Sequence, residues 1–222
     1  MKNKISTCIF DLDGTLLNTL DSITYYINEV FALHNLAPLE PSQVRRALGG
    51  GAENLIAVSC AFRGVEDEST VKQIFNEYKS RYDKAPEYLV EPYDGIITML
   101  EALKTRGVRL AVVSNKPDHS TGELVRRYFG DIFDVCLGAR EGIPLKPAPD
   151  GVLEVIRILG VSPDECAFIG DGDLDILTAL AADVALPISV LWGFRDRDEL
   201  YELGARCFAS AADDVLRAVL EF

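Results

Sequence analysis

The sequence predicts an α/β protein in which a doubly wound, Rossmann-like parallel sheet carries an inserted helical domain. Short β-rich runs alternate with segments of helical apolar spacing along most of the 222 residues, which is typical of a parallel sheet with helices on both faces. Only the stretch from about residue 17 to residue 87 has helical spacing and turn residues without a convincing strand. We therefore expect an α/β catalytic core from residues 1–17 and 88–222, and a helical cap domain from residues 18–87.

The expected strands are short runs rich in apolar and β-branched residues. They are residues 5–10, 110–114, 133–137, 167–170, 188–191 and 206–209. Apolar residues at helical spacing lie between these runs, in residues 96–103, 152–159 and 215–219. Two neighbouring parallel strands must be joined by a crossover connection, which is usually a helix, and this alternation supplies one.

Two segments of the insert have an apolar face at helical spacing. The first face consists of Leu20, Ile23, Ile27, Val30 and His34, and the second of Val71, Ile74, Phe75 and Tyr78. Prolines 38, 41 and 86 and the glycines at 49–51 divide the insert into short helices.

The formal net charge of −13 argues against nonspecific binding to nucleic acid or to an anionic membrane, because a polyanion would be repelled. A phosphorylated substrate would feel the same repulsion. If the ligand is a phosphate ester, a metal ion and particular Lys or Arg side chains must therefore neutralise it locally.

Five widely spaced cysteines among apolar neighbours favour buried free thiols in a reducing compartment. Before Asp11 the chain has only the short apolar run Ile9–Phe10, so we expect neither a signal peptide nor a spanning helix. These features predict a cytoplasmic protein.

The motif Asp11-Leu12-Asp13-Gly14-Thr15-Leu16 follows the first expected strand directly. In an extended strand, residues i and i+2 face the same way, so Asp11 and Asp13 would converge at the carboxyl edge of the sheet. Open α/β sheets bind ligands at this edge. Gly14 lets the chain turn tightly and leaves its amide near the site. The competing interpretation is an Asp-Gly turn beside a solvated aspartate.

Three further segments place polar groups at strand ends or in a constrained loop. Ser114 and Asn115 stand at the end of the second expected strand and offer donors for a phosphoryl oxygen. Lys146 lies in a loop fixed by two prolines, although an isolated lysine is usually a surface residue. Asp171, Asp173 and Asp175 follow another strand and offer the oxygen ligands that a hard divalent cation requires, although one of them could simply cap a helix.

These four segments, in this order, resemble the motifs of the haloacid dehalogenase superfamily, and the resemblance extends over nearly the full chain. The segments Pro92-Tyr93-Asp94-Gly95, Ser114-Asn115-Lys116-Pro117 and Lys146-Pro147-Ala148-Pro149-Asp150 are most similar to its phosphoglycolate phosphatase branch. Gly172, where many relatives carry Ser, and the extra acid Asp173 depart from the family pattern and leave the detailed metal geometry open.

The resemblance implies a Mg2+-dependent phosphatase that acts on a small phosphorylated metabolite. Asp11 would be the nucleophile and Asp13 the general acid and base, with Ser114 and Lys146 assisting. Mg2+ would be bound by Asp11, the Asp13 backbone carbonyl and Asp171, with Asp175 beside it. Gly14, Thr15 and Asn115 would complete the phosphate cradle.

Substrate specificity in this family lies in the cap, where Arg45, Arg46 and the turn at Gly49-Gly50-Gly51 are candidates for the substrate's far end. Exposed basic helix residues are the competing interpretation. The core motifs are equally compatible with a sugar-phosphate mutase of the β-phosphoglucomutase type, a pyrophosphatase or a phosphonate hydrolase. A non-catalytic phosphate-binding module would be expected to lack Asp11 or Asp13. The sequence leaves open whether the protein is a monomer or a homodimer.

Overall fold

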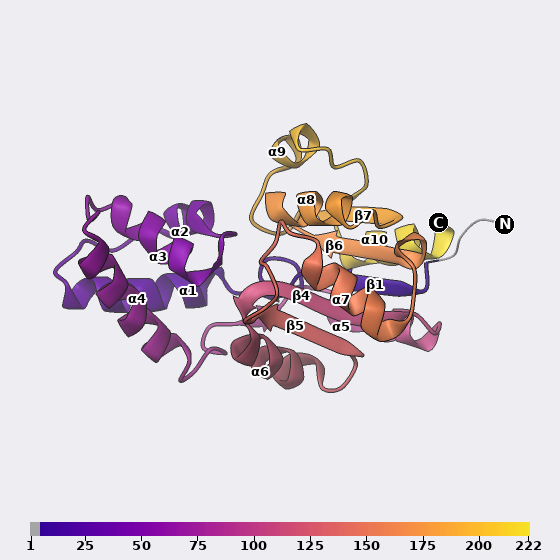
Figure 1. The fold of residues 1–222 in the computed structure, drawn as a ribbon, viewed down its shortest axis with the longest axis horizontal. Helices are drawn as coiled ribbons and strands as arrows, with labels where there is room; N and C mark the ends of the chain where they lie inside the picture. The colour runs from indigo at the N-terminus through magenta and orange to yellow at the C-terminus, as the bar shows by residue number, and fades with distance from the viewer. Residues whose placement is uncertain (1–4) are drawn as a thin grey trace. The chain divides into compact units, whose positions relative to one another are not determined.

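A six-stranded parallel sheet is the centre of the larger of two units in this protein, whose residues 5–222 are described by a computed structural model (Figure 1). The strand order is β5-β4-β1-β6-β7-β8. Their bounds are β1 Thr7–Phe10, β4 Arg109–Pro117, β5 Val135–Ala139, β6 Cys166–Gly170, β7 Leu186–Val190 and β8 Phe208–Ala209. The predicted doubly wound α/β core is confirmed.

Strand β1 lies between β4 and β6, and all five neighbouring pairs in the sheet are parallel. The chain moves outward from β1 to β4 and β5, then returns to β6 on the other side of β1. The winding direction therefore reverses beside β1, and the carboxyl edge at such a switch point is where open α/β sheets bind ligands.

The middle of the sheet is covered on both faces. Cys8, Ile9 and Phe10 of β1 are fully buried, as expected for a parallel strand between two helical layers. Ile9 packs in a cluster with Val152 and Val155 of α7 (Asp150–Leu159) and with residues of α8 (Asp173–Ala181). Helices α5 (Ile96–Thr105) and α10 (Ala212–Glu221) contact each other and lie behind the sheet in Figure 1.

Three helices of this unit lie outside the helical segments expected from the sequence: α6 (Asp118–Phe129), α8 and α9 (Arg197–Glu202). The buried face of α6 includes Ser120 and Thr121 beside two apolar residues, so few apolar residues mark this face in the sequence. Helix α9 has one buried residue, Leu200, and is too short to show a period.

The second unit, Asn18–Glu91, is helical. It contains α1 (Leu20–Leu33), α2 (Pro41–Ala47), α3 (Gly51–Ala61) and α4 (Glu68–Tyr82). One core cluster joins all four helices, and the two faces anticipated on α1 and α4 supply Ile23, Ile27, Val30, Ile74 and Tyr78 to it.

The second boundary of the helical insert lies four residues later in the structure than the sequence predicted. We expected the α/β core to resume at residue 88, but it resumes at Pro92. The ring of Tyr88 lies 4.8 Å from that of Tyr25 and 6.3 Å from that of Tyr26, centre to centre, which holds this segment against α1. The short strands β2 (Leu17–Asn18) and β3 (Glu91–Pro92) pair where the chain enters and leaves the insert, so the region also contains a strand that its sequence did not indicate.

None of the helices in residues 5–222 combines the length and apolarity that crossing a bilayer requires. Cys8, Cys60 and Cys166 are buried, whereas Cys136 and Cys207 are partly exposed.

Candidate active site

Asp11 stands immediately after β1, at the carboxyl edge of the sheet where the winding reverses. Its backbone N–H donates to the carbonyl oxygen of Ile169 on β6 at 2.9 Å, which continues the ladder by one residue. The residue is 8% exposed, and its Oδ1 lies 2.8 Å from the Nζ of Lys146. Asp11 is therefore fixed at both its backbone and its side chain.

Lys146 lies in the connection between β5 and α7, and its ammonium group joins two carboxylates. Besides Asp11, its Nζ contacts Oδ1 of Asp175 at 2.6 Å. The side-chain amide of Asn115 holds the Lys146 backbone, because its Nδ2 donates to the carbonyl oxygen at 3.0 Å and its Oδ1 accepts from the N–H at 2.8 Å. Asn115 thus positions the loop that carries the lysine.

Asp171 and Asp175 come from the end of β6 and the first turn of α8. Oδ2 of Asp175 accepts hydrogen bonds from the backbone N–H groups of Asp171 at 3.1 Å and Gly172 at 2.9 Å, so this carboxylate caps its own helix. Carboxylate oxygens of Asp11, Asp171 and Asp175 lie within 4.8 Å of one another. Three acids therefore surround one small volume.

Two carboxyl groups of this cluster, those of Asp11 and Asp171, have strongly raised pKa values. Burial, with the charge of Asp175 adding to it, raises the pKa of Asp11 to about 7 even though Lys146 opposes the shift. Burial and the charges of Asp175 and Asp11 raise the pKa of Asp171 to about 8. Burial alone would lower the pKa of Lys146, but Asp11 and Asp175 raise it above its ordinary value. The cluster therefore has more negative charge than its single ammonium group can neutralise.

This donor set fits a hard divalent cation. All three acids offer oxygen ligands, and they converge at a buried position where an added positive charge would relieve their repulsion. Mg2+ is one such cation, and protein sites usually hold it by one or two carboxylates together with water and substrate oxygens.

Two glycines make room for the acids. Gly14 has φ +86°, and a Cβ at this position would lie 2.4 Å from Oδ2 of Asp171. A Cβ on Gly170 would lie 2.3 Å from Cγ of Asp175. A side chain at either position would displace a member of the cluster. The N–H of Gly14 donates to the carbonyl oxygen of Leu17 at 2.9 Å, which closes the turn after β1.

Asp13 does not join the acid cluster but pairs with Lys116 at the end of β4. The Nζ of Lys116 lies 3.0 Å from each carboxylate oxygen of Asp13. Ser114 is nearby in sequence and buried, and its Oγ accepts from the Lys116 backbone N–H at 3.2 Å. The side chain of Asp13 is 19% exposed, so a substrate could reach it. Lys116 was not among the expected site residues.

Thr15 contacts the acid loop. Its hydroxyl donates to Oδ1 of Asp171 at 2.8 Å. Oδ2 of Asp171 in turn accepts from the backbone N–H of Phe194 at 2.7 Å, and the indole N–H of Trp192 donates to the Thr15 carbonyl oxygen at 3.0 Å. The segment after β7 therefore belongs to the site, although no sequence motif pointed to it.

Arg45 and Gly50 lie in the helical unit. Arg45 is a partly buried residue of α2, and Gly50 is the exposed N-cap of α3. Their expected contact with substrate stays a prediction.

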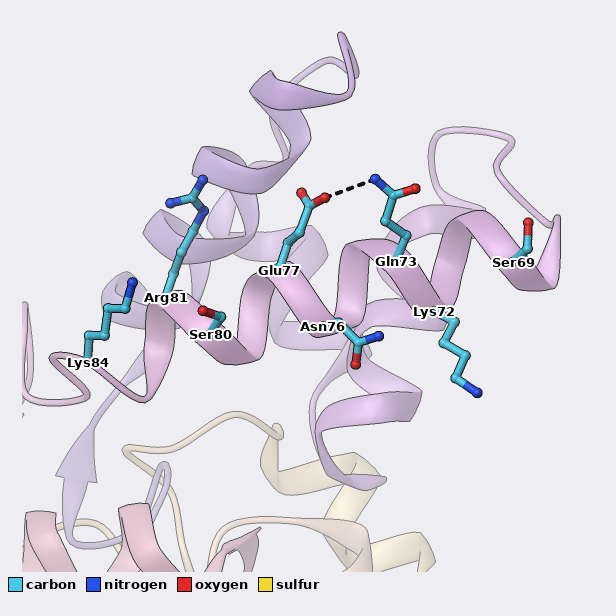
Figure 2. A pocket seen from close by; sticks show the side chains of 8 residues that line it. All are labelled: Ser69, Lys72, Gln73, Asn76, Glu77, Ser80, Arg81 and Lys84. Atoms are coloured by element: carbon cyan, nitrogen blue, oxygen red, sulfur yellow. Dashed lines mark hydrogen bonds between the residues drawn. The ribbon is translucent and has the colours of Figure 1, made fainter.

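The helical unit also has a shallow surface pocket along α4, where Gln73 donates to Glu77 at 3.0 Å (Figure 2). Its lining is polar and comes from residues 69–84. None of the expected site residues lines this pocket.

Comparison with known proteins gives the same family as the site. The family model for haloacid dehalogenase-like hydrolases matches residues 8–187. A phosphoglycolate phosphatase of Rhodospirillum rubrum is 33% identical over 216 residues, covering 92% of this chain and 88% of that protein. An N-acetylmuramic acid 6-phosphate phosphatase of Pseudomonas aeruginosa is 31% identical over 174 residues, covering 78% of this chain and 76% of that protein.

Among solved structures, a Lactobacillus delbrueckii protein provisionally assigned as a phosphoglycolate phosphatase matches with a TM-score of 0.91. It is 30% identical, and the match covers 99% of this chain and 100% of that one. Sequence, fold and site geometry agree. The chain therefore belongs to the haloacid dehalogenase-like hydrolases and is a phosphatase of the branch that contains the phosphoglycolate phosphatases.

Proposed function

We propose that this chain is a Mg2+-dependent phosphatase that hydrolyses a small phosphate monoester of the phosphoglycolate type through an aspartyl-phosphate. The observation that carries the proposal is the different setting of two aspartates two residues apart. Asp11 is buried and held by Lys146 inside the acid cluster, whereas Asp13 is partly exposed and lies outside it. This difference supports Asp11 as the nucleophile and Asp13 as the group that exchanges protons with substrate or water.

In the first half-reaction, a carboxylate oxygen of Asp11 attacks the phosphorus and the bond to the leaving oxygen breaks. Asp13 gives that oxygen a proton, which releases the alcohol. Lys146 and Ser114 face the negative charge on the phosphoryl oxygens. Mg2+ bound by Asp11, the Asp13 carbonyl and Asp171, with Asp175 beside it, would supply the positive potential that lets a carboxylate approach a phosphate dianion.

In the second half-reaction, Asp13 acts as a base and takes a proton from the water that attacks the phosphorus of the aspartyl-phosphate. The bond to Asp11 breaks, inorganic phosphate leaves and the carboxylate is restored. Asp13 must leave Lys116 to do this. Its exposure and its position directly before the turn at Gly14 support such a movement.

The names of the relatives support a small phosphate monoester as substrate, because one acts on phosphoglycolate and another on an amino-sugar phosphate. We propose that Arg45 and Gly50 help to select the part of the substrate that does not react. Asn115 positions the Lys146 loop, and Thr15 holds Asp171. These two residues would therefore act on the phosphate through Lys146 and Asp171.

The test is phosphate release by purified protein with Mg2+ over a panel that includes 2-phosphoglycolate, sugar phosphates, an aryl phosphate and pyrophosphate. Acid quenching with labelled substrate should trap a phosphoprotein. The Asp11→Asn protein, which retains the shape of the side chain, should give neither result. Release at the same rate by Asp11→Asn would refute the assignment of the nucleophile. Isomerisation of a sugar phosphate without phosphate release would show a mutase instead.

A further inference from the structure

The segment that follows β7, Trp192-Gly193-Phe194-Arg195, contacts both the turn after β1 and the acid loop after β6. It contains neither an acid nor a nucleophile, and the mechanism above does not use it. Its contacts nevertheless converge on one carboxylate, that of Asp171.

Two donors fix the Asp171 carboxylate from opposite oxygens. The Thr15 hydroxyl donates to Oδ1 at 2.8 Å, and the Phe194 backbone N–H donates to Oδ2 at 2.7 Å. Asp171 is 2% exposed, so water cannot replace either donor easily. With one donor on each oxygen, the plane of the carboxylate is determined by protein groups before any cation arrives.

The backbone on either side restricts Asp171 further. A Cβ on Gly193 would lie 2.2 Å from Cβ of Asp171 and 2.4 Å from its Oδ2. A Cβ on Gly14 would lie 2.4 Å from the same oxygen. The side chain of Asp171 is therefore packed between two glycine backbones and has little room to rotate.

Trp192 connects this arrangement to the first motif. Its indole N–H donates to the carbonyl oxygen of Thr15 at 3.0 Å. The segment 192–195 therefore binds Oδ2 of Asp171 directly and also holds Thr15, whose hydroxyl binds Oδ1. The ring of Trp192 lies 6.3 Å from that of Tyr93, and Arg195 pairs with Asp173 at 3.4 Å. Together with the Phe194 hydrogen bond to Asp171, these are four contacts of the segment, of which two are to the acid loop.

We propose that residues 192–195 are a positioning element that fixes Asp171 for Mg2+ and thereby sets the metal affinity of the site. The inference rests on the proposed Mg2+-dependent function. Groups that orient a ligand carboxylate change metal affinity by about 10- to 100-fold when they are removed. The segment acts through Asp171 and Thr15 and touches no reacting atom.

The test is a calorimetric titration of the metal-free full-length protein with Mg2+ at pH 7.5. Trp192→Phe keeps an aromatic ring but removes the indole donor, and we expect Mg2+ binding to weaken by about tenfold. Gly193→Ala places a Cβ against Asp171 and should weaken binding further. Gly122→Ala is the matched control, because a Cβ on this residue of α6 would meet no atom within 4 Å, and its Mg2+ affinity should equal that of the wild type.

Activity measured against Mg2+ concentration separates positioning from a general structural effect. In Trp192→Phe, the Mg2+ concentration for half-maximal activity should rise in proportion to the dissociation constant, while kcat at saturating Mg2+ recovers to within a few-fold of the wild type and KM for substrate is unchanged. A loss that Mg2+ cannot restore would overturn the inference.

Trp192 is the only tryptophan in the sequence, so its fluorescence should change saturably with Mg2+ in the wild type and not in Asp171→Asn. If the wild type bound no Mg2+, the metal dependence of the proposed function would fail and this inference with it. If the wild type bound Mg2+ but Trp192→Phe bound it equally well, only the inference would fail. Trp192→Phe and the fluorescence titration decide the question even if Gly193→Ala does not fold.

Discussion

Replacing Asp11 with Asn should stabilise the metal-free protein at alkaline pH while it abolishes turnover. The substitution removes one buried negative charge but keeps an oxygen that can accept from Lys146. A carboxyl pKa that moves from 3.8 to about 7 corresponds to about 4 kcal/mol against the charged form above that pH. The substitution also removes the repulsion between Asp11 and Asp171, and the fold can relax around either side chain. We therefore expect the free energy of unfolding to rise by about 1–3 kcal/mol.

The gain should depend on pH in a particular direction. The unfolded chain releases the Asp11 proton near pH 4, whereas the native metal-free protein retains it up to about pH 7. Across this window the native state holds more protons, so the free energy of unfolding of the wild type falls as pH rises. Asp11→Asn lacks this loss, so its advantage should grow from about pH 4 to pH 7 and then remain constant.

The assay is urea unfolding in excess chelator at pH 5 and pH 8, followed by the fluorescence of Trp192. Asp131→Asn removes an exposed carboxylate and serves as the matched control, with an expected change near zero at both values. An Asp11→Asn protein that is less stable than the wild type at pH 8, or whose advantage is the same at both pH values, would refute the reasoning about the acid cluster.

Three further predictions concern catalysis. Asp13→Asn should lower kcat by about a hundredfold or more, because both proton transfers lose the group that donates and accepts the proton. Steady-state rates measure this effect, with circular dichroism to check folding, and a near-normal kcat would exclude Asp13 from that role. Ca2+ in place of Mg2+ should suppress turnover, since its larger, looser coordination shell would misplace Asp11. Rates measured with each ion after exhaustive metal removal test this prediction, and full activity in excess chelator would show that no metal is required. Arg45→Ala should lower kcat/KM for 2-phosphoglycolate by about tenfold or more if a charge-assisted hydrogen bond is lost, whereas kcat/KM for an aryl phosphate should change far less. Equal losses on both substrates would assign Arg45 to folding or to general phosphate binding.

The strand ends of the site could be predicted because their sequence signals are local. The runs that precede Asp11 and Asp171 are apolar and end abruptly in polar residues, as buried parallel strands do. Strand β4 instead continues through Ser114 to Pro117, three residues beyond the expected end. The convergence of these strand ends follows from the common carboxyl edge of a parallel sheet. The turn at Gly14 could also be read from the sequence, because an aspartate-glycine pair after a strand favours a tight turn.

The contacts of Lys116, Trp192 and Phe194 could not be predicted, because each depends on segments that are distant in the chain. Phe194 contributes a backbone N–H, which every residue except proline possesses, so its identity carries no signal. Trp192 donates to a carbonyl oxygen of Thr15, 177 positions earlier. Lys116 reaches Asp13 across neighbouring strands, and an isolated lysine after a strand is normally a surface residue.

The strand order explains why these particular loops form the site. Strands β1, β6 and β7 are consecutive neighbours, so the segments that follow them are adjacent at the carboxyl edge. Asp11, Asp171 and Phe194 stand on these three segments. The third segment contacts the second through the Phe194–Asp171 hydrogen bond and the first through the hydrogen bond from Trp192 to Thr15. Strand β5 lies on the opposite side of β1, beyond β4, so Lys146 needs a long connection to approach Asp11. The side chain of Asn115, near the end of β4, holds that connection at Lys146. The acids therefore follow β1 and β6, whereas the ammonium group that pairs with Asp11 and Asp175 arrives from the opposite side of β1.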